Sequence, residues 1–103
     1  MNTPRQGDIW WADTEDGRRP VLVVTRSAAV PVLTGIVVAP VTRSVRGIPT
    51  EIAMGQPEGL PSDCAASFDN LRRMRRSVLT ERVGSLGVRA GEICNALDAL
   101  ADC

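Results

Sequence analysis

The chain has 103 residues, the size of one domain with its own core, and we expect a single domain over residues 1–103. Twelve basic residues, all of them arginine, balance twelve acidic residues, so the formal net charge is zero and overall charge says nothing about partners. Apolar residues make up 44% of the chain with one Phe, two Trp and no Tyr, which predicts an aliphatic core, and no apolar run approaches membrane-spanning length.

Short apolar or alternating runs, separated by polar segments that contain Gly or Pro, predict six strands. In chain order these strands cover residues 7–12, 19–26, 33–41, 48–53, 64–68 and 82–86. The polar connections between them lie at 13–17, 27–31, 42–47 and 55–61. Pro20 is tolerated near the start of a strand or on a sheet edge, and Pro40 indicates a bulge or a bend in the third strand.

The last third of the chain predicts one helix. Residues 71–78 alternate apolar side chains with arginines and fit either a strand or a helical turn. Residues 89–100 are typical of a helix, and its apolar face contains Ile93, Ala96, Leu97 and Leu100. Several short strands followed by one helix predict a mainly β fold, a small and strongly bent antiparallel barrel.

The ends of the second and third predicted strands carry the functional signal. Arg18 and Arg19 lead into the second strand, and Thr42 and Arg43 follow the third. If the two strands run antiparallel, these ends lie side by side. An arginine beside a hydroxyl on a rigid sheet suits the binding and polarisation of a phosphodiester. Residues 17–50 also hold five arginines and no acidic residue.

The chain has no histidine, so it lacks the usual neutral-pH general base and the commonest metal ligand. Its three cysteines, Cys64, Cys94 and Cys103, are widely spaced and include no C-x-x-C pair. They indicate reduced thiols in the cytoplasm, with no zinc site and no disulfide framework. We expect Cys94 to pack as a small apolar side chain and Cys103 to be a terminal thiol able to oxidise between chains.

Five motifs, in this order, resemble the MazF/PemK family of toxin–antitoxin ribonucleases. They are Gly-Asp-Ile-Trp, Arg-Pro-Val-Leu-Val-Val, Val-Ala-Pro-Val-Thr, Ser-Phe-Asp-Asn-Leu and Leu-x-x-Arg-Val-Gly-x-Leu, which begin at positions 7, 19, 38, 67 and 79. An amphipathic helix follows the last motif. The resemblance covers nearly the whole chain.

The resemblance implies an SH3-like antiparallel barrel of the CcdB/MazF type with a C-terminal helix, assembled as a homodimer. It implies metal- and cofactor-independent cleavage of single-stranded RNA, messenger RNA first and transfer or ribosomal RNA as alternatives, by a cytoplasmic toxin that a cognate antitoxin neutralises. The family's catalytic arginine falls on Arg19 and its catalytic hydroxyl on Thr42. The RNA 2′-hydroxyl would attack the adjacent phosphorus, giving a 2′,3′-cyclic phosphate and a 5′-hydroxyl. The general base stays open between Asp69 and Glu51.

Further residues are candidates for binding RNA rather than cleaving it. Arginines could contact the backbone or stack on unpaired bases, and an acid–amide pair has edges suited to reading a base. The candidates are Arg18, Arg43, Arg46, Asp69, Asn70, Arg72 and Arg73. The alternative for the arginines is a solvated face without function. Trp10 and Trp11 should face opposite sides of the first strand, and we expect both to be structural.

Two other functions compete with RNA cleavage. A CcdB-like toxin shares the barrel but poisons DNA gyrase without catalysis. That activity depends on a C-terminal tryptophan, whereas residues 101–103 are Ala-Asp-Cys. An SH3-like adaptor for proline-rich peptides would need an aromatic-lined groove, which three aromatic residues cannot easily build. Asn70, where many relatives carry glutamine, leaves the RNA target sequence open.

Overall fold

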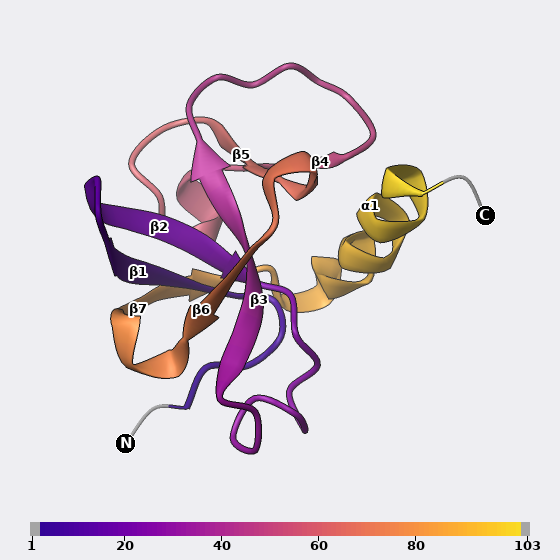
Figure 1. The fold of residues 1–103 in the computed structure, drawn as a ribbon. Coiled ribbons are helices and arrows are strands. Elements are labelled where there is room, and N and C mark those ends of the chain that lie inside the picture. Colours follow the sequence, from indigo (N-terminus) through magenta and orange to yellow (C-terminus); the bar gives the residue numbers. More distant parts are fainter. Residues whose placement is uncertain (1–2, 102–103) are drawn as a thin grey trace.

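A computed structural model describes residues 3–101 (Figure 1). Its strands are β1 (Asp8–Thr14), β2 (Gly17–Val23), β3 (Gly35–Thr42), β4 (Glu51–Met54), β5 (Cys64–Ser67), β6 (Arg72–Arg75) and β7 (Leu79–Ser85). Helix α1 (Glu92–Leu100) follows the last strand. Single 3-10 turns interrupt the second half of the chain at η1 (Gln56–Glu58), η2 (Phe68–Asn70), η3 (Arg76–Val78) and η4 (Gly87–Gly91).

The strands form one curled antiparallel sheet. Its order is β4-β5-β3-β2-β1-β7, and β6 pairs with β3 beside this path. The sheet coils into a half-barrel, and α1 lies at one side of it (Figure 1). The predicted fold class, a mainly β antiparallel barrel with a C-terminal helix, is therefore confirmed.

Strand β3 changes partners along its length. Gly35–Val38 pairs with β6, whereas Val41 and Thr42 pair with β5. The change falls around Pro40, where the sequence predicts a bulge or a bend. It lets one strand link the two parts of the sheet, which is how a short sheet curls around a core.

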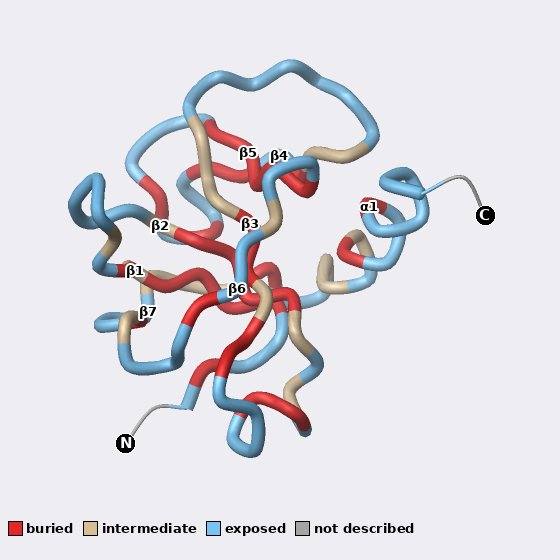
Figure 2. The backbone as a smooth tube through the Cα atoms, in the orientation of Figure 1, coloured by how far each residue is buried: buried red, intermediate tan, exposed pale blue. Residues whose placement is uncertain are grey.

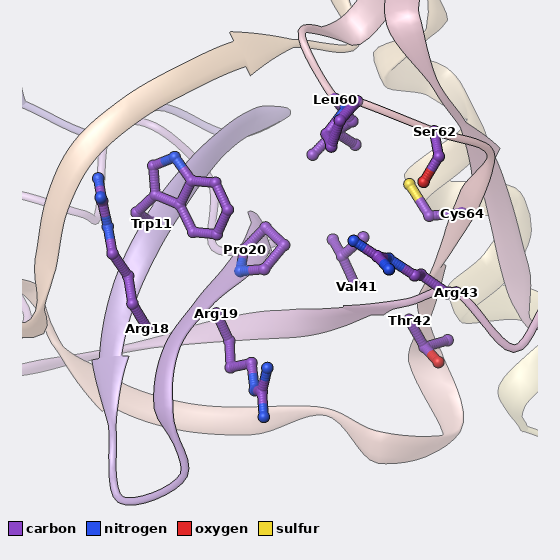
Figure 3. A pocket seen from close by; sticks show the side chains of 11 residues that line it. Trp11, Arg18, Arg19, Pro20, Val41, Thr42, Arg43, Leu60, Ser62 and Cys64 are labelled. Carbon is purple, nitrogen blue, oxygen red and sulfur yellow. The ribbon is translucent and has the colours of Figure 1, made fainter.

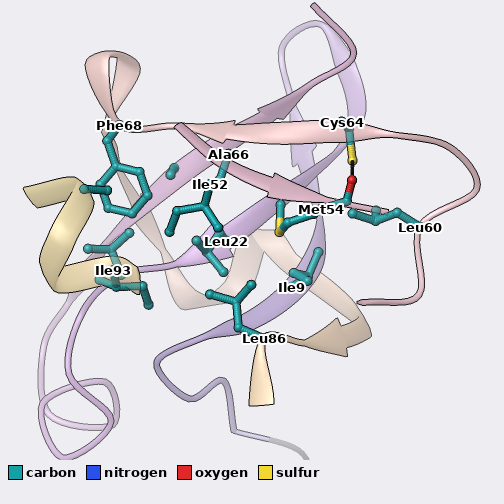
Figure 4. Packing of buried hydrophobic residues seen from close by; sticks show 13 residues of the cluster. Ile9, Leu22, Ile52, Met54, Leu60, Cys64, Ala66, Phe68, Leu86 and Ile93 are labelled. Carbon is teal, nitrogen blue, oxygen red and sulfur yellow. Dashed lines mark hydrogen bonds between the residues drawn. The ribbon is translucent and has the colours of Figure 1, made fainter. Parts of the chain in front are cut away.

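Two apolar clusters pack on the two faces of the central strands. Ile9 and Leu22 face the cluster beneath α1, together with Phe68 and Ile93 (Figure 4). Their strand neighbours alternate to the other face, so Trp10 joins a second cluster that contains the following residues: Val21, Val23, Val38 and Met74. The central strands are consequently buried where they cross the core, at Asp8–Trp10 of β1, Val21–Val23 of β2 and Gly35–Ile36 and Val38–Ala39 of β3 (Figure 2).

Some predicted boundaries shift. Residues 71–78 resolve into strand β6 followed by the η3 turn, and the last strand is longer than predicted, beginning at Leu79. The second strand ends at Val23 rather than Arg26, because Val24 and Thr25 both donate their backbone N–H to the Val37 carbonyl and leave the ladder.

The predicted helix is partly wrong. Residues 87–91 form the 3-10 turn η4, and α1 begins only at Glu92, where no side chain caps its N-terminus. Ile93 and Ala96 are buried, but Leu97 and Leu100 are 36% and 41% exposed, so only half of the predicted apolar face is covered. No helix of residues 3–101 has the length and apolarity needed to cross a bilayer.

The cysteines also differ from expectation. Cys64 is buried, whereas Cys94 lies on the exposed side of α1, so the prediction that it packs in the core is wrong. Cys103 lies outside the described residues.

Candidate active site

A cavity opens where β2 begins and β3 ends. The two strands pair only from Val21 to Val23, opposite Val38 to Pro40, and β3 then turns to β5. Beyond this short ladder the strand ends separate, leaving a cavity of about 550 Å³ (Figure 3). We call it the cleavage pocket, after the reaction that the resemblance predicts at Arg19 and Thr42, and its size is that of a ligand site.

Arg19 and Thr42 both line the cleavage pocket. Continuing the β2–β3 register past its last pair would set Arg19 opposite Thr42, so the antiparallel arrangement predicted from the sequence is confirmed. Arg19 is exposed and forms no ion pair with any residue from 3 to 101. Thr42 Oγ1 accepts a hydrogen bond from the Ser44 N–H at 3.0 Å, which leaves the hydroxyl hydrogen free to donate. Their catalytic roles stay a prediction.

Arg18 is already engaged inside the protein. Its Nη2 donates to Glu81 Oε2 at 2.6 Å, and its guanidinium carbon lies 4.8 Å from the ring centroid of Trp11. Trp11 is half-buried and lines the cleavage pocket, so Arg18 and Trp11 together make one wall (Figure 3). Sequence reasoning treated Trp11 as structural, although its alternation with buried Trp10 was a signal that it faces outward.

The opposite wall comes from the loop that carries Leu60 and Ser62. Buried Glu58 holds this loop: its Oε1 accepts from the Gly55 N–H at 2.7 Å, and its Oε2 pairs with Arg89 Nη1 at 3.2 Å. Sequence reasoning missed this network. A Gly-x-x-Glu spacing at 55–58 is the signal that could have suggested it, because a Glu at this offset reaches back to the first N–H of a helical turn.

Arg89 ties the same network to the rest of the fold. Its Nη2 donates to the Ala53 carbonyl of β4 at 2.7 Å, and its Nε pairs with Glu92 of α1 at 2.7 Å. The hydrogen bond to Glu92 raises the pKa of Arg89, and the same bond lowers the pKa of Glu92. The start of α1, the edge of β4 and the pocket loop are thus joined through one guanidinium.

Cys64 lines the cleavage pocket with a buried thiol. Burial raises the pKa of its thiol, which donates to the Met54 carbonyl at 3.7 Å (Figure 4). A protonated and buried thiol is unreactive.

A second cavity of about 140 Å³ adjoins the first, and Thr42 lines both. We call it the side cavity. It brings together Arg46, Glu51, Asp69 and Asn70 from the β3–β4 connection, β4 and η2. The two candidates for the general base, Asp69 and Glu51, therefore share a cavity with Thr42, a proximity that the sequence could not establish.

The predicted RNA-binding residues fall into three groups. Arg18 and Arg43 line the cleavage pocket, and Arg46 lines the side cavity with the acid–amide pair. Arg72 and Arg73 are exposed on β6 and line neither. The Arg73 guanidinium lies over Gly35, where an added Cβ would come within 2.6 Å of Arg73 Cζ. In residues 3–101, no three His, Cys, Asp or Glu side chains gather as a metal site requires.

Comparison with known proteins gives a consistent result. A family profile described as "PemK-like, MazF-like toxin of type II toxin-antitoxin system" matches residues 5–101. The chain is 38% identical to the "Probable endoribonuclease MazF5" of Mycobacterium tuberculosis, over 97% of this chain and 94% of that protein.

Solved structures agree with the family match. The Mycobacterium tuberculosis toxin MazF-mt6 superposes with a TM-score of 0.78 at 33% identity, over 90% of this chain and 91% of that one. A mycobacterial endoribonuclease in complex with its cognate antitoxin superposes with a TM-score of 0.82 at 26% identity, over 94% and 93% of the two chains.

Proposed function

The chain belongs to the PemK-like, MazF-like family of toxins of type II toxin–antitoxin systems, and we propose that it is an endoribonuclease that cleaves single-stranded RNA between Arg19 and Thr42. The observation that carries the proposal is an exposed guanidinium without an acidic partner in residues 3–101, on the same pocket as a hydroxyl that is free to donate. The gyrase-poisoning alternative is not favoured, because the relatives are named endoribonucleases.

The geometry suits transfer of the phosphodiester to the neighbouring 2′-hydroxyl. The 2′ oxygen forms a bond to phosphorus while the bond from phosphorus to the 5′ oxygen breaks, and the products are a 2′,3′-cyclic phosphate and a 5′-hydroxyl end. Negative charge gathers on the non-bridging oxygens, where the planar guanidinium of Arg19 can hold two of them. Thr42 donates to a non-bridging or the leaving oxygen.

Two proton transfers complete the reaction. The 2′-hydroxyl loses a proton to a general base, and the 5′ oxygen gains one from water or from the protonated base. Asp69 and Glu51 remain the candidates for the base, since arginine stays protonated in water. Trp11, beside Arg18, offers an aromatic surface on which an unpaired base can stack next to the phosphate.

Mapping the 5′ ends of RNA fragments after brief exposure to the purified protein tests the proposal. We expect 5′-hydroxyl ends at recurring short motifs, and cleavage that continues at full rate in excess EDTA, because arginine and a hydroxyl supply the charge stabilisation otherwise given by a metal. Loss of cleavage on chelation, restored by magnesium, would contradict this mechanism. Deoxyribose at the cleavage position is the matched control and should block the reaction, because it removes the nucleophile.

We also propose that the toxin acts on messenger RNA in the cytoplasm, as a homodimer, and that a cognate antitoxin neutralises it. The antitoxin complex of a structural relative supports the last point. Exposed apolar side chains, Leu33 and Val45 among them, support an interface with a second chain. We expect light scattering at micromolar concentration to give the mass of two chains. A monomer at that concentration would contradict the dimer.

A further inference from the structure

We propose that the side cavity holds one nucleobase of the RNA and favours a base with an exocyclic amine over uracil. The inference rests on the proposed RNA cleavage and adds which chemical class of base the toxin selects next to the phosphate. Four polar side chains of the cavity carry it: Arg46, Glu51, Asp69 and Asn70.

The position of the cavity argues for a base. Because Thr42 lines both cavities, a nucleotide whose phosphate lies between Arg19 and Thr42 has the side cavity as its immediate neighbour. The cavity is far smaller than the cleavage pocket, about 140 Å³ against about 550 Å³, and suits a single flat ring system. Pro40 and Ile48 supply apolar surface for the face of the ring, while the polar groups meet its edge.

The cavity presents hydrogen-bond acceptors that are already oriented. Asp69 Oδ2 accepts from the Thr50 hydroxyl at 2.6 Å, which fixes the carboxylate and leaves Oδ1 free. Glu51 Oε1 accepts from the backbone N–H groups of Arg46 and Gly47 at 2.9 and 3.1 Å, which leaves Oε2. In each case one oxygen is held by the protein and the other remains for a ligand.

The amide of Asn70 follows the same pattern. Its Nδ2 donates to Ser67 Oγ at 2.8 Å, so the orientation of the amide is set and its oxygen remains as a third acceptor. Within residues 3–101, one oxygen each of Glu51, Asp69 and Asn70 thus has no protein hydrogen-bond partner, and all three residues line the side cavity. Two of these oxygens belong to carboxylates, which only accept when ionised.

This acceptor set discriminates among bases. Adenine, cytosine and guanine each carry an amino group that can donate to a carboxylate, and the Arg46 guanidinium can donate to a ring nitrogen or carbonyl of the same base. Uracil offers a single N–H between two carbonyl oxygens, so its carbonyls would face the carboxylates without a donor. A well-placed pair of hydrogen bonds to a base lowers the binding affinity for the wrong base by about 10- to 100-fold.

Binding of uncleavable RNA tests the proposal. The probes are fluorescein-labelled hexanucleotides with 2′-fluoro sugars, one all uridine and the others with a single A, C or G at each position in turn, read by fluorescence anisotropy. We expect an amine-bearing base at one position to tighten binding about 10- to 100-fold over hexauridine. Equal affinity for every probe, or tightest binding of hexauridine, would overturn the proposal.

Variants place the effect in this cavity. Asp69→Asn keeps an oxygen for the Thr50 hydroxyl and replaces the free acceptor with an amide NH2 donor. Glu51→Gln likewise keeps an oxygen for the backbone N–H groups of Arg46 and Gly47 and replaces the other with a donor. Each should reduce the preference over uracil about tenfold or more, while Asp98→Asn, an exposed carboxylate on α1 outside both cavities, should leave it unchanged. If thermal unfolding shows that one variant is not folded, the other decides. An unchanged base profile in the folded variants would overturn the proposal.

Because the readout is binding, a role of either carboxylate as the general base does not disturb it. The two proposals also fail separately. A wild-type protein that prefers amine-bearing bases but cleaves no ribose-containing RNA would refute the proposed ribonuclease activity alone. One that cleaves RNA freely after uridine-only stretches would refute the base selection alone.

Discussion

Replacing Arg19 with alanine is expected to lower the rate of RNA cleavage about 10²- to 10³-fold, because it removes one preorganised donor to the charge that develops on the phosphate. The fold should survive, since Arg19 is exposed at the start of β2 and makes no ion pair within residues 3–101. Cleavage is measured on a fluorescent oligoribonucleotide under single-turnover conditions, with thermal unfolding as the check on stability.

Substitutions of Thr42 test the other half of the proposed active site. Thr42→Val removes the hydroxyl and also the acceptor for the Ser44 N–H, so Thr42→Ser, which keeps both, is the matched variant and should retain activity. If Arg19 and Thr42 act on one phosphate, their effects on the activation free energy of cleavage should not be additive, because the two residues act as a unit. The double variant should then raise this free energy by less than the sum of the two single variants.

A second arginine serves as the control for charge. Arg5 is exposed, and the bond that holds its segment runs from its backbone N–H to Asp8, so Arg5→Ala should be nearly silent. Near-full cleavage by Arg19→Ala together with a loss in Arg5→Ala would show that the active site lies elsewhere.

That Arg19 and Thr42 lie at one end of the sheet was predictable, because it depends only on two neighbouring strands running antiparallel. Polar residues lead into the first of two aliphatic runs and follow the second, so these polar ends meet if the runs form neighbouring antiparallel strands. The observed register, with Val21 opposite Pro40, has this arrangement. Successive side chains of a strand point to opposite faces, so the sequence likewise placed Trp10 and Trp11 on opposite faces of β1.

What the sequence could not predict depends on contacts across long separations. Arg18 pairs with Glu81, which lies 63 residues away, and its guanidinium lies over the ring of Trp11. Arg89 reaches Glu58 across 31 residues. A charge pattern shows that such residues are polar, but only the fold shows which partner each one meets.

The helix illustrates a different limit. Periodicity marks the apolar side of α1, but burial is decided by what packs against it. Ile93 and Ala96 reach the cluster around Phe68, whereas Leu97 and Leu100 extend beyond it. The weak start was visible in the sequence, because Gly91 lowers helix propensity and offers no side chain to cap the first turn.

The largest effect on stability is expected at Gly84 of β7. An added Cβ would lie 2.0 Å from the Glu58 carbonyl oxygen and 2.8 Å from its carbon, so the backbone of η1 must move away. Overpacking of this kind costs about 3 kcal/mol when the clash is with backbone. For a domain of this size that loss lowers the melting temperature by at least about 10 °C.

Gly84→Ala should also lower cleavage, because η1 carries Glu58 and thereby holds the loop of Leu60 and Ser62 that walls the cleavage pocket. The matched control is Gly91→Ala. Gly91 has helical backbone angles, φ −61° and ψ −20°, and an added Cβ there meets nothing within 4 Å. Alanine at that position should be neutral or stabilise by about 0.5–1 kcal/mol, since it restricts the unfolded chain without crowding the folded one. Differential scanning calorimetry of both variants separates the two cases. Equal melting temperatures for Gly84→Ala and Gly91→Ala would contradict this prediction. They would show that η1 can move away from β7 without loss of stability, and that the contact with β7 does not hold the pocket wall in place.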